Sequence, residues 1–206
     1  MKQYPKIPHW YKIPFGGNCV AFYKEDGTNM RFEWSKKRNK WYKFGTRNNI
    51  ITLNDENYGD GIEIFMTKYG EKLIDVFKTK YKNIESVVVF CEYFGNNSFA
   101  GKHIPTDEKY LRLFDVSLYK NGFVEPNEFI KNFGHLDIPK IVYEGEYNKE
   151  LIDKVRNNNF DLIEGVICKG TFKKTKTIWQ SKVKTNLWLE RLESERGKNS
   201  ILEEFS

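Results

Sequence analysis

The sequence feature that most constrains the fold is a series of many short apolar runs. Their length suits strands better than helices. The run Ser86–Tyr93 (SVVVFCEY) is continuous and rich in β-branched residues, as expected of a buried strand. Asn29–Trp34 instead alternates between apolar and polar residues, which predicts a half-buried strand. The other expected strands are Cys19–Tyr23, Trp41–Phe44, Leu111–Leu118, Lys140–Tyr143, Ile163–Lys169 and Thr177–Lys184.

Helical periodicity is found in fewer places. Apolar residues recur at helical spacing over residues 60–80, which predicts an amphipathic helix. Shorter helices are expected over Pro126–Phe133, over Asn148–Asn157 with Asn148 as the N-cap, and from Asn186 to about Gly197. Because strands outnumber helices and do not alternate regularly with them, we expect an α+β fold with twisted, largely antiparallel sheets. The 206 residues contain no repeat and no Gly/Ser/Pro-rich linker, so we expect a single domain over residues 1–206, with 186–206 a C-terminal helix and tail.

Composition narrows the class of protein. The chain has 34 Lys+Arg against 28 Asp+Glu, a formal charge of +6, which fits a polyanionic partner such as nucleic acid. Cys19, Cys91 and Cys168 are widely spaced in apolar runs, so we expect buried thiols rather than a zinc site or disulfides. The N-terminus lacks the apolar stretch of a signal peptide, and no run is long enough to span a bilayer. These features predict a soluble cytoplasmic protein with no membrane partner.

The segment Lys24–Asn29 (KEDGTN) places a lysine at the end of an apolar strand, before an acidic turn that contains glycine. This arrangement can hold an amine rigidly. A lysine is nucleophilic only when it is neutral, a state that burial and nearby cations favour. Taken alone, however, so short a motif is also compatible with an ordinary surface turn between two strands.

Five further motifs follow in order. They are KFGTRN (Lys43–Asn48), FCEYFG (Phe90–Gly95), LRLFDV (Leu111–Val116), EGVICKG (Glu164–Gly170) and KVKT (Lys182–Thr185). In order and strand context, the set resembles the covalent nucleotidyltransferase superfamily of ligases and capping enzymes. The resemblance runs from Lys24 to Lys184. It implies a nucleotidyltransferase domain, ATP-grasp-like, whose sheets flank a nucleotide cleft.

The resemblance also implies a reaction in three steps. Lys24 matches the adenylated lysine, which attacks the α-phosphate of ATP and releases pyrophosphate. AMP then passes to a 5′-phosphate end, and a 3′-hydroxyl finally displaces AMP to seal the strand. Each step is nucleotidyl transfer, so catalysis depends mainly on positioning and on stabilising charge.

Cationic and aromatic residues are assigned by the same resemblance. Lys182 and Lys184 are expected to contact the α-phosphate, and their i, i+2 spacing on a strand places both on one face. Arg47 is expected to contact the ribose or the phosphates. Phe114 matches an aromatic residue that stacks on adenine, a use that suits a flat ring. Each of these residues also has a plain structural alternative, as a solvated strand face, a loop residue or a core phenylalanine.

Two glutamates lie at the ends of expected strands. By resemblance, Glu92 binds the ribose hydroxyls or supports a metal ion, and Glu164 is the better candidate for a metal ligand. Mg²⁺, or Mn²⁺ in its place, prefers oxygen ligands and commonly contacts substrate phosphates. The structural alternative for each glutamate is a salt bridge. The expected cofactors are therefore ATP and a divalent metal ion.

Asn29 favours one branch of the superfamily. RNA ligases that seal nicks in duplex RNA usually carry Asn at this position, whereas DNA ligases and capping enzymes usually carry Arg. Only a short segment follows Lys184, so we expect no OB-fold, and the terminal helix or a partner protein would have to help grip the substrate. We therefore predict an ATP-dependent RNA ligase acting on RNA with 5′-phosphate and 3′-hydroxyl ends. The alternatives are a DNA ligase core acting on DNA or an RNA–DNA hybrid, a capping-type guanylyltransferase, and a catalytically silent RNA-binding module. The Asn- and Lys-rich composition suits a virus or phage with an AT-rich genome, which would place the protein in the host cytoplasm.

Overall fold

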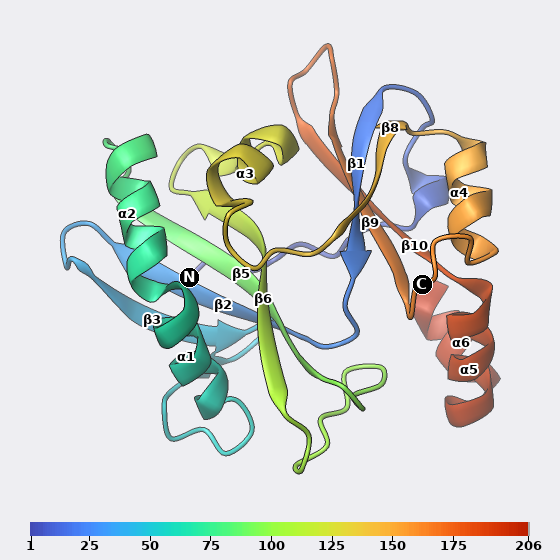
Figure 1. The fold of residues 1–206 in the computed structure, drawn as a ribbon, viewed down its shortest axis with the longest axis horizontal. Coiled ribbons are helices and arrows are strands. Elements are labelled where there is room, and N and C mark those ends of the chain that lie inside the picture. The colour runs from blue at the N-terminus through green and yellow to red at the C-terminus, as the bar shows by residue number, and fades with distance from the viewer. Residues whose placement is uncertain (206) are drawn as a thin grey trace. The chain divides into compact units, whose positions relative to one another are not determined.

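The computed structural model describes residues 1–205, which form two compact units. Unit 1 comprises Met1–Pro5 and Asp26–Ile138, and unit 2 comprises Lys6–Glu25 and Pro139–Ser206. The elements of each unit can be followed along the chain by colour in Figure 1. Among the described residues, no helix is both long and apolar enough to cross a membrane.

Unit 1 is built on a six-stranded antiparallel sheet with the strand order β4-β3-β2-β5-β6-β7. Its strands are β2 (Thr28–Ser35), β3 (Lys40–Thr46), β4 (Ile50–Ile51), β5 (Ser86–Gly95), β6 (Lys109–Leu118) and β7 (Gly122–Phe123). The helical segments α1 (Gly59–Phe65), η2 (Met66–Gly70) and α2 (Glu71–Lys80) follow one another along one side of the sheet (Figure 1). The segment η2 is a π-helix.

The core of unit 1 lies between this sheet and these helices. Met30, Phe32 and Trp34 are all buried, as their alternation along β2 predicts. The ring of Phe32 stacks on Phe65 of α1 with 3.7 Å between centroids. Helix α3 (Pro126–Phe133) has the predicted bounds, because Pro126 suits the first turn and the Glu125 side chain caps it.

Unit 2 is built on a four-stranded antiparallel sheet with the order β10-β9-β1-β8. Its strands are β1 (Asn18–Lys24), β8 (Ile141–Glu146), β9 (Gly165–Thr171) and β10 (Ile178–Lys184), and its helices are η1 (Trp10–Lys12), α4 (Lys149–Arg156), α5 (Asn186–Arg196) and α6 (Lys198–Phe205). The core of unit 2 joins Ala21, Cys168 and Val183 of the sheet to Leu151 and Val155 of α4.

The α+β class and the antiparallel sheets are as predicted, and the residues described after Lys184 form α5 and α6 rather than the strands of an OB-fold. Asn148 caps α4 as expected, through a 3.0 Å hydrogen bond from Leu151 N to Asn148 Oδ1. All three cysteines are buried and free. The sequence did not indicate α6, β4 or β7, which are short and carry no clear period.

Candidate active site

The three lysines expected to act in catalysis lie on one face of the unit 2 sheet. In the sheet register, Lys24 of β1 and Lys184 of β10 both pair with Gly165 of β9. Residues directly opposite one another in antiparallel strands share a face of the sheet. Lys182 and Lys184 are two residues apart on one strand, so they also share a face. The predicted common face of Lys182 and Lys184 is thus observed, and Lys24 shares it.

Gly165 allows β9 and β10 to lie close together beside these lysines. A Cβ built on Gly165 would lie 2.0 Å from Val183 O and 2.8 Å from Lys184 Cα. Both neighbours are backbone atoms, so only glycine lets β10 approach β9 this closely. The glycine of the EGVICKG motif therefore allows the close approach of β10, which carries Lys184, to β9.

Glu164 joins the two lysines. Lys24 Nζ donates to Glu164 Oε2 at 2.7 Å, and Lys184 Nζ lies 2.8 Å from Glu164 Oε1. The Glu164 side chain is 2% exposed and that of Lys184 is 7% exposed, whereas that of Lys24 is 23% exposed. Buried charges are tolerated when they are paired, so Glu164 neutralises the buried lysine and fixes the amine of the accessible one.

A second carboxylate, from α6, completes the cluster. Glu204 Oε1 lies 2.6 Å from Lys182 Nζ, and Glu204 Oε2 lies 3.1 Å from Lys184 Nζ. Burial lowers the pKa of Lys182, with smaller lowering contributions from Lys184 and Lys24, and Glu204 partly opposes this shift. The ammonium group of Lys184 also lies 3.4 Å from the centroid of the Trp188 ring. Unit 2 therefore holds three cations around two carboxylates on one sheet face.

The motif residues of unit 1 also meet on one sheet face. Asn29 of β2 pairs with Glu92 of β5, which pairs in turn with Arg112 of β6. This row lies on the face opposite to Met30 and Phe32. Asn29 Oδ1 is buried, yet no described residue donates a hydrogen bond to it. Buried polar atoms are normally paired, so this acceptor is a natural place for a ligand donor.

Phe114 lies on β6 next to this row. The β5–β6 register shifts between Phe90 and Cys91, leaving Phe114 as the extra residue of a bulge. This bulge interrupts the strict alternation that the sequence suggests. The ring of Phe114 is half-buried and meets Tyr4 edge to face, with 5.0 Å between centroids. Tyr4 also donates to the buried Asp115 at 2.9 Å, and its role beside Phe114 had no sequence signal.

The turn of the first motif is anchored to unit 1 by contacts that explain its residues. A Cβ on Gly27 would lie 2.4 Å from Tyr93 O, so only glycine fits against β5 there. Asp26 Oδ2 accepts a hydrogen bond from Ala100 N at 2.5 Å, and Thr28 Oγ1 lies 2.8 Å from His103 Nε2. No sequence pattern singles out His103, because an isolated histidine carries no spacing signal.

Two other basic residues have simpler surroundings. Arg47 is exposed in the turn between β3 and β4. Lys169 is buried on the face that also carries Lys24, with its Nζ 5.4 Å from the centroid of the Phe22 ring. Arg47 is thus accessible to a ligand, whereas Lys169 packs within the sheet face.

The two predicted metal ligands belong to different units, Glu92 to unit 1 and Glu164 to unit 2. Within the described part of the chain, no group of three or more His, Cys, Asp or Glu side chains gathers around a common point. Both oxygens of Glu164 bind ammonium groups. In the described part of the chain, Glu164 is therefore held by lysines rather than gathered with other carboxylates.

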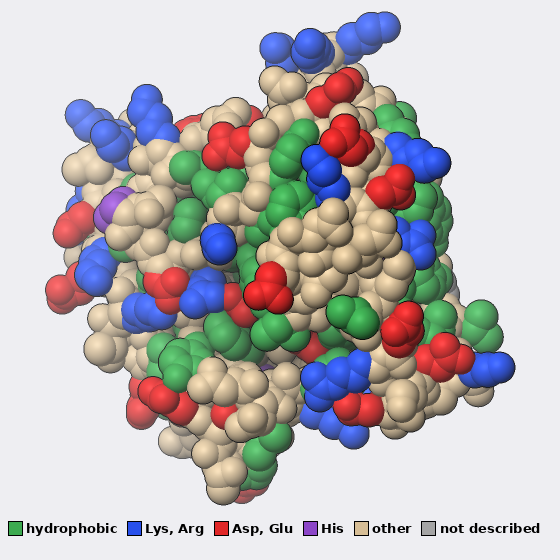
Figure 2. All heavy atoms as spheres, turned by 45° about the vertical axis from the view of Figure 1, so that its right-hand side comes forward, with side chains coloured by type: hydrophobic (Ala, Val, Ile, Leu, Met, Phe, Trp, Pro, Cys, Tyr) green, Lys and Arg blue, Asp and Glu red, His purple; other side chains and the backbone are tan. Residues whose placement is uncertain are grey.

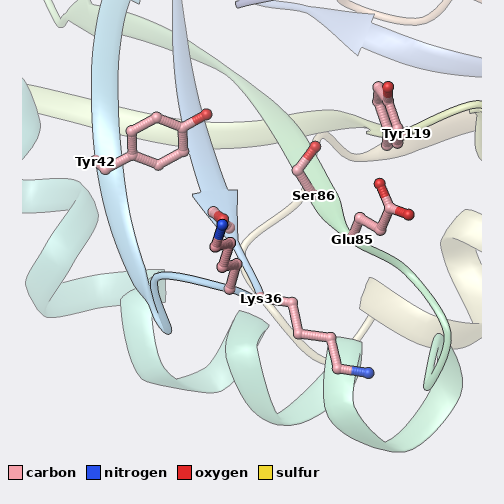
Figure 3. Close-up of a pocket in the computed structure, with 7 residues that line it drawn as sticks. Lys36, Tyr42, Glu85, Ser86 and Tyr119 are labelled. Carbon is pink, nitrogen blue, oxygen red and sulfur yellow. The ribbon is translucent and has the colours of Figure 1, made fainter.

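Charge is mixed on the face shown in Figure 2, where Lys and Arg side chains are interspersed with Asp and Glu. A hollow with more basic than acidic lining residues lies in unit 1 at the far end of β2 from Asn29 and is here called the lysine groove. It comprises two neighbouring cavities, of about 530 Å³ and about 390 Å³, whose linings share Glu85 and Tyr119. Figure 3 shows Lys36, Tyr42, Ser86 and Tyr119 around the larger cavity. Its basic lining residues are Lys36, Lys37, Lys80, Lys82 and Lys120.

Comparison with known proteins relates this geometry to one fold. The structure matches a Naegleria gruberi RNA ligase mutant in its apo form with a TM-score of 0.67 and 15% identity, covering 93% of this chain and 58% of that one. It matches a mutant of the same ligase with ATP and Mn with a TM-score of 0.64 and 16% identity, covering 91% of this chain and 57% of that one. An archaeal ATP-dependent RNA ligase matches with a TM-score of 0.66 and 15% identity, covering 95% of this chain and 51% of that one.

The chain thus spans somewhat more than half the length of these solved ligases. No match was found among curated protein sequences. A family model described as RNA ligase matches residues 17–184, which include the first five motifs in full and Lys182–Lys184 of the sixth. Because that model covers most of the chain, the protein belongs to the RNA ligase family.

Proposed function

We propose that this family member is an ATP-dependent RNA ligase in which Lys24 carries AMP, and that its two units form one nucleotidyltransferase domain over residues 1–206. The observation that carries the proposal is the Lys24–Glu164–Lys184 network, in which one buried carboxylate binds both ammonium groups at 2.7 and 2.8 Å. A surface turn would not need a buried partner for its lysine. A catalytic amine does, because it must be held in one place.

In the first step, Lys24 Nζ attacks the α-phosphorus of ATP. A phosphorus–nitrogen bond forms, the bond from that phosphorus to the bridging oxygen breaks, and pyrophosphate leaves. Glu164 Oε2, at 2.7 Å from Lys24 Nζ, is placed to accept the proton that the amine loses. Lys182 and Lys184 would stabilise the negative charge on the α-phosphate oxygens, as fixed cations in a partly buried site do.

In the later steps, AMP passes from Lys24 to the 5′-phosphate of an RNA end, and a 3′-hydroxyl then displaces AMP. The phosphorus–nitrogen bond breaks as the 5′-5′ pyrophosphate forms. The second displacement forms the phosphodiester and releases AMP. Lys182 and Lys184 would again contact the phosphate oxygens, because each displacement develops charge at the same kind of centre.

Unit 1 would bind the rest of the nucleotide. We assign adenine to the half-buried ring of Phe114, the ribose to Glu92, and the ribose or the outer phosphates to the exposed Arg47. Asn29 would hydrogen-bond a ribose hydroxyl through its buried, unpaired Oδ1. A 2′-hydroxyl can donate to such an acceptor and is the group that distinguishes RNA from DNA.

Mg²⁺ or Mn²⁺ fits as a cofactor shared with the substrate. Glu164 is the carboxylate that contacts both Lys24 and Lys184, and Glu92 is the one expected on unit 1. Such an ion would neutralise phosphate charge and orient the leaving pyrophosphate. Glu164 would have to exchange one of its lysine contacts for the ion.

The lysine groove is our candidate for contacts with RNA outside the reacting ends. It lies about 20 Å from Asn29, at roughly 3.3 Å per residue along β2. Its lysines are exposed, and Tyr119 is 49% exposed beside them. Ammonium groups beside an accessible aromatic ring suit single-stranded nucleic acid, whose phosphates and bases they bind respectively. A partner protein and a cytoplasmic location stay predictions from the sequence.

Sealing assays test this function. Matched nicks in duplex RNA, in an RNA–DNA hybrid and in duplex DNA, each with 5′-phosphate and 3′-hydroxyl ends, should be compared for wild type, Asn29→Ala and Lys24→Ala. We expect wild type to seal the RNA nick best, Asn29→Ala to lose that preference, and Lys24→Ala to seal nothing. Equal sealing of all three nicks by wild type would instead favour the DNA ligase alternative.

A further inference from the structure

The carboxylate of Glu204 occupies a site built from donors that belong to distant parts of unit 2. Its two oxygens lie 2.6 Å from Lys182 Nζ and 3.1 Å from Lys184 Nζ. The Glu204 side chain is 16% exposed and that of Lys182 is 14% exposed. A carboxylate is a flat anion with two oxygens, and these two lysines are the ones assigned to phosphate oxygens.

A third donor comes from the segment before η1. His9 is 3% exposed and is held beside Lys182 by a parallel bridge, in which Lys182 N donates to Pro8 O at 2.9 Å. His9 Nε2 lies 2.6 Å from Glu204 O and 3.5 Å from Glu204 Oε1. A carbonyl oxygen can only accept, so His9 Nε2 carries a hydrogen and faces the anion as a donor.

Helix α6 lies on the surface of unit 2. Among its described residues none is buried. Besides the Glu204 contacts, Phe205 stacks on His9 with 4.7 Å between centroids, Tyr11 donates to Phe205 O at 3.3 Å, and Ser200 Oγ donates to Leu192 O of α5 at 3.4 Å. Elements with few buried apolar contacts open at low free energy. The anion that fills the site is therefore attached to an element that can leave it.

We propose that His9, Lys182 and Lys184 form a three-donor subsite for a phosphate group of the nucleotide, and that Glu204 occupies this subsite in the free protein. The inference rests on the proposed function and adds to it His9 as a phosphate-contacting residue. Binding of nucleotide then displaces Glu204 from both lysines and frees the last turn of α6. His9 Nε2 keeps its hydrogen and donates to a phosphate oxygen instead of Glu204 O.

Binding of inorganic tripolyphosphate, measured by calorimetry in a Lys24→Ala background, tests the subsite without requiring catalysis. Glu204→Gln keeps the shape of the side chain and removes its charge, so we expect tripolyphosphate to bind roughly tenfold tighter once the competing anion is gone. Glu203→Gln, which makes the same charge change one residue away, should bind as the parent does. Equal affinities for Glu204→Gln and Glu203→Gln would overturn the role of Glu204.

The histidine is tested by His9→Ala and His9→Gln, because a glutamine amide can still donate near the position of Nε2. We expect His9→Ala to weaken tripolyphosphate binding about fivefold or more and His9→Gln to restore most of it. In the Lys24-containing protein, His9→Ala should raise KM for ATP more than it lowers kcat. Unchanged tripolyphosphate binding by His9→Ala, in a variant whose thermal melting matches that of its parent, would overturn the assignment of His9.

These outcomes separate the two claims. Tripolyphosphate binding that depends on Glu204 and His9, in a protein that never labels Lys24 with AMP, would support the subsite and remove the ligase mechanism. Labelling of Lys24 that is unchanged by substitution of Glu204 and of His9 would support the ligase mechanism and contradict the proposed subsite.

Discussion

Glu164 and Lys24 are 140 residues apart in sequence, yet Lys24 Nζ donates to Glu164 Oε2 at 2.7 Å. The register of the unit 2 sheet brings them together, because Lys24 pairs with Gly165, the residue after Glu164. The same register places Lys184 on the other side of Gly165. Two strands that flank β9 therefore deliver two ammonium groups to one buried carboxylate.

Replacing Glu164 by Gln should impair both stability and the first chemical step. The substitution removes the charge that compensates Lys184, which still has Glu204, so we expect a loss of about 2 kcal/mol and a fall in Tm of roughly 4–8 °C. Loss of a proton acceptor beside Lys24 should slow formation of lysyl-AMP about 100-fold. Thermal melting and single-turnover labelling measure the two effects. Glu190→Gln, at an exposed position of α5, is the control and should change neither.

Replacing Gly165 by Ala should push β10 away from β9. The new Cβ would lie 2.0 Å from Val183 O, and overpacking of this kind costs about 1–3 kcal/mol. We expect a lower Tm and little labelling of Lys24, because Lys184 moves with its strand. Gly70→Ala is the matched control, since its Cβ would meet nothing closer than 3.7 Å. Wild-type labelling by Gly165→Ala would show that the strand spacing is not critical.

Acidification should release α6. Burial raises the pKa of Glu204, but Lys184 and Lys182 outweigh it and the pKa lies below its usual value of 4.5. A depressed carboxyl pKa contributes stability that is fully present above the unfolded pKa and is lost as pH falls through the folded one. The titratable groups that face Glu204 are His9, whose pKa is lowered by burial, and the two lysines Lys182 and Lys184.

We therefore expect Glu204→Gln to melt at a lower temperature than wild type at pH 7, with the difference shrinking as the pH falls below 4.5. Melting curves from pH 3 to 7 follow this difference, with Glu203→Gln as control. A difference that stays constant down to the lowest pH would contradict the ion pairing of Glu204.

Removing charge from the lysine groove should weaken binding of RNA and leave labelling of Lys24 intact. The test variant is Lys36→Ala/Lys82→Ala/Lys120→Ala, and the control Lys173→Ala/Lys174→Ala/Lys176→Ala removes the same charge from the exposed β9–β10 turn of unit 2. Fluorescence anisotropy with single-stranded RNA should show a larger drop in affinity for the groove variant. It should also show a shallower salt dependence, by about 0.7 in log–log slope for each phosphate that a lysine no longer neutralises. Equal drops in affinity for both variants would mean that only net charge matters.

Local sequence patterns predicted those parts of the fold that depend on local periodicity. The alternation of Met30, Phe32 and Trp34 indicated the buried face of β2, and Pro126 indicated the start of α3. The bulge at Phe114 was not predictable, because it depends on how β6 meets β5. Helix α6 was missed for a similar reason, since the contacts of its Glu204 with His9, Lys182 and Lys184 join residues distant in the sequence.

The candidate site shows the same division. The i, i+2 spacing of Lys182 and Lys184 was enough to place both on one face of β10, and the motif order pointed to Lys24 and Glu164. His9, Tyr4 and His103 could not be found in this way. Each acts through a partner distant in sequence, such as Lys182 for His9 or Thr28 for His103. A single sequence carries no signal for such pairs.

The central claim is that Lys24 takes up AMP from ATP. The direct measurement incubates the purified protein with α-labelled ATP, or with α-labelled GTP, and magnesium, and reads label on the protein in a denaturing gel for wild type and Lys24→Ala. We predict label from ATP on wild type and none on Lys24→Ala. Absence of label from ATP on wild type, or label that persists in Lys24→Ala, would contradict the account, and label from GTP alone would point to a capping-type guanylyltransferase.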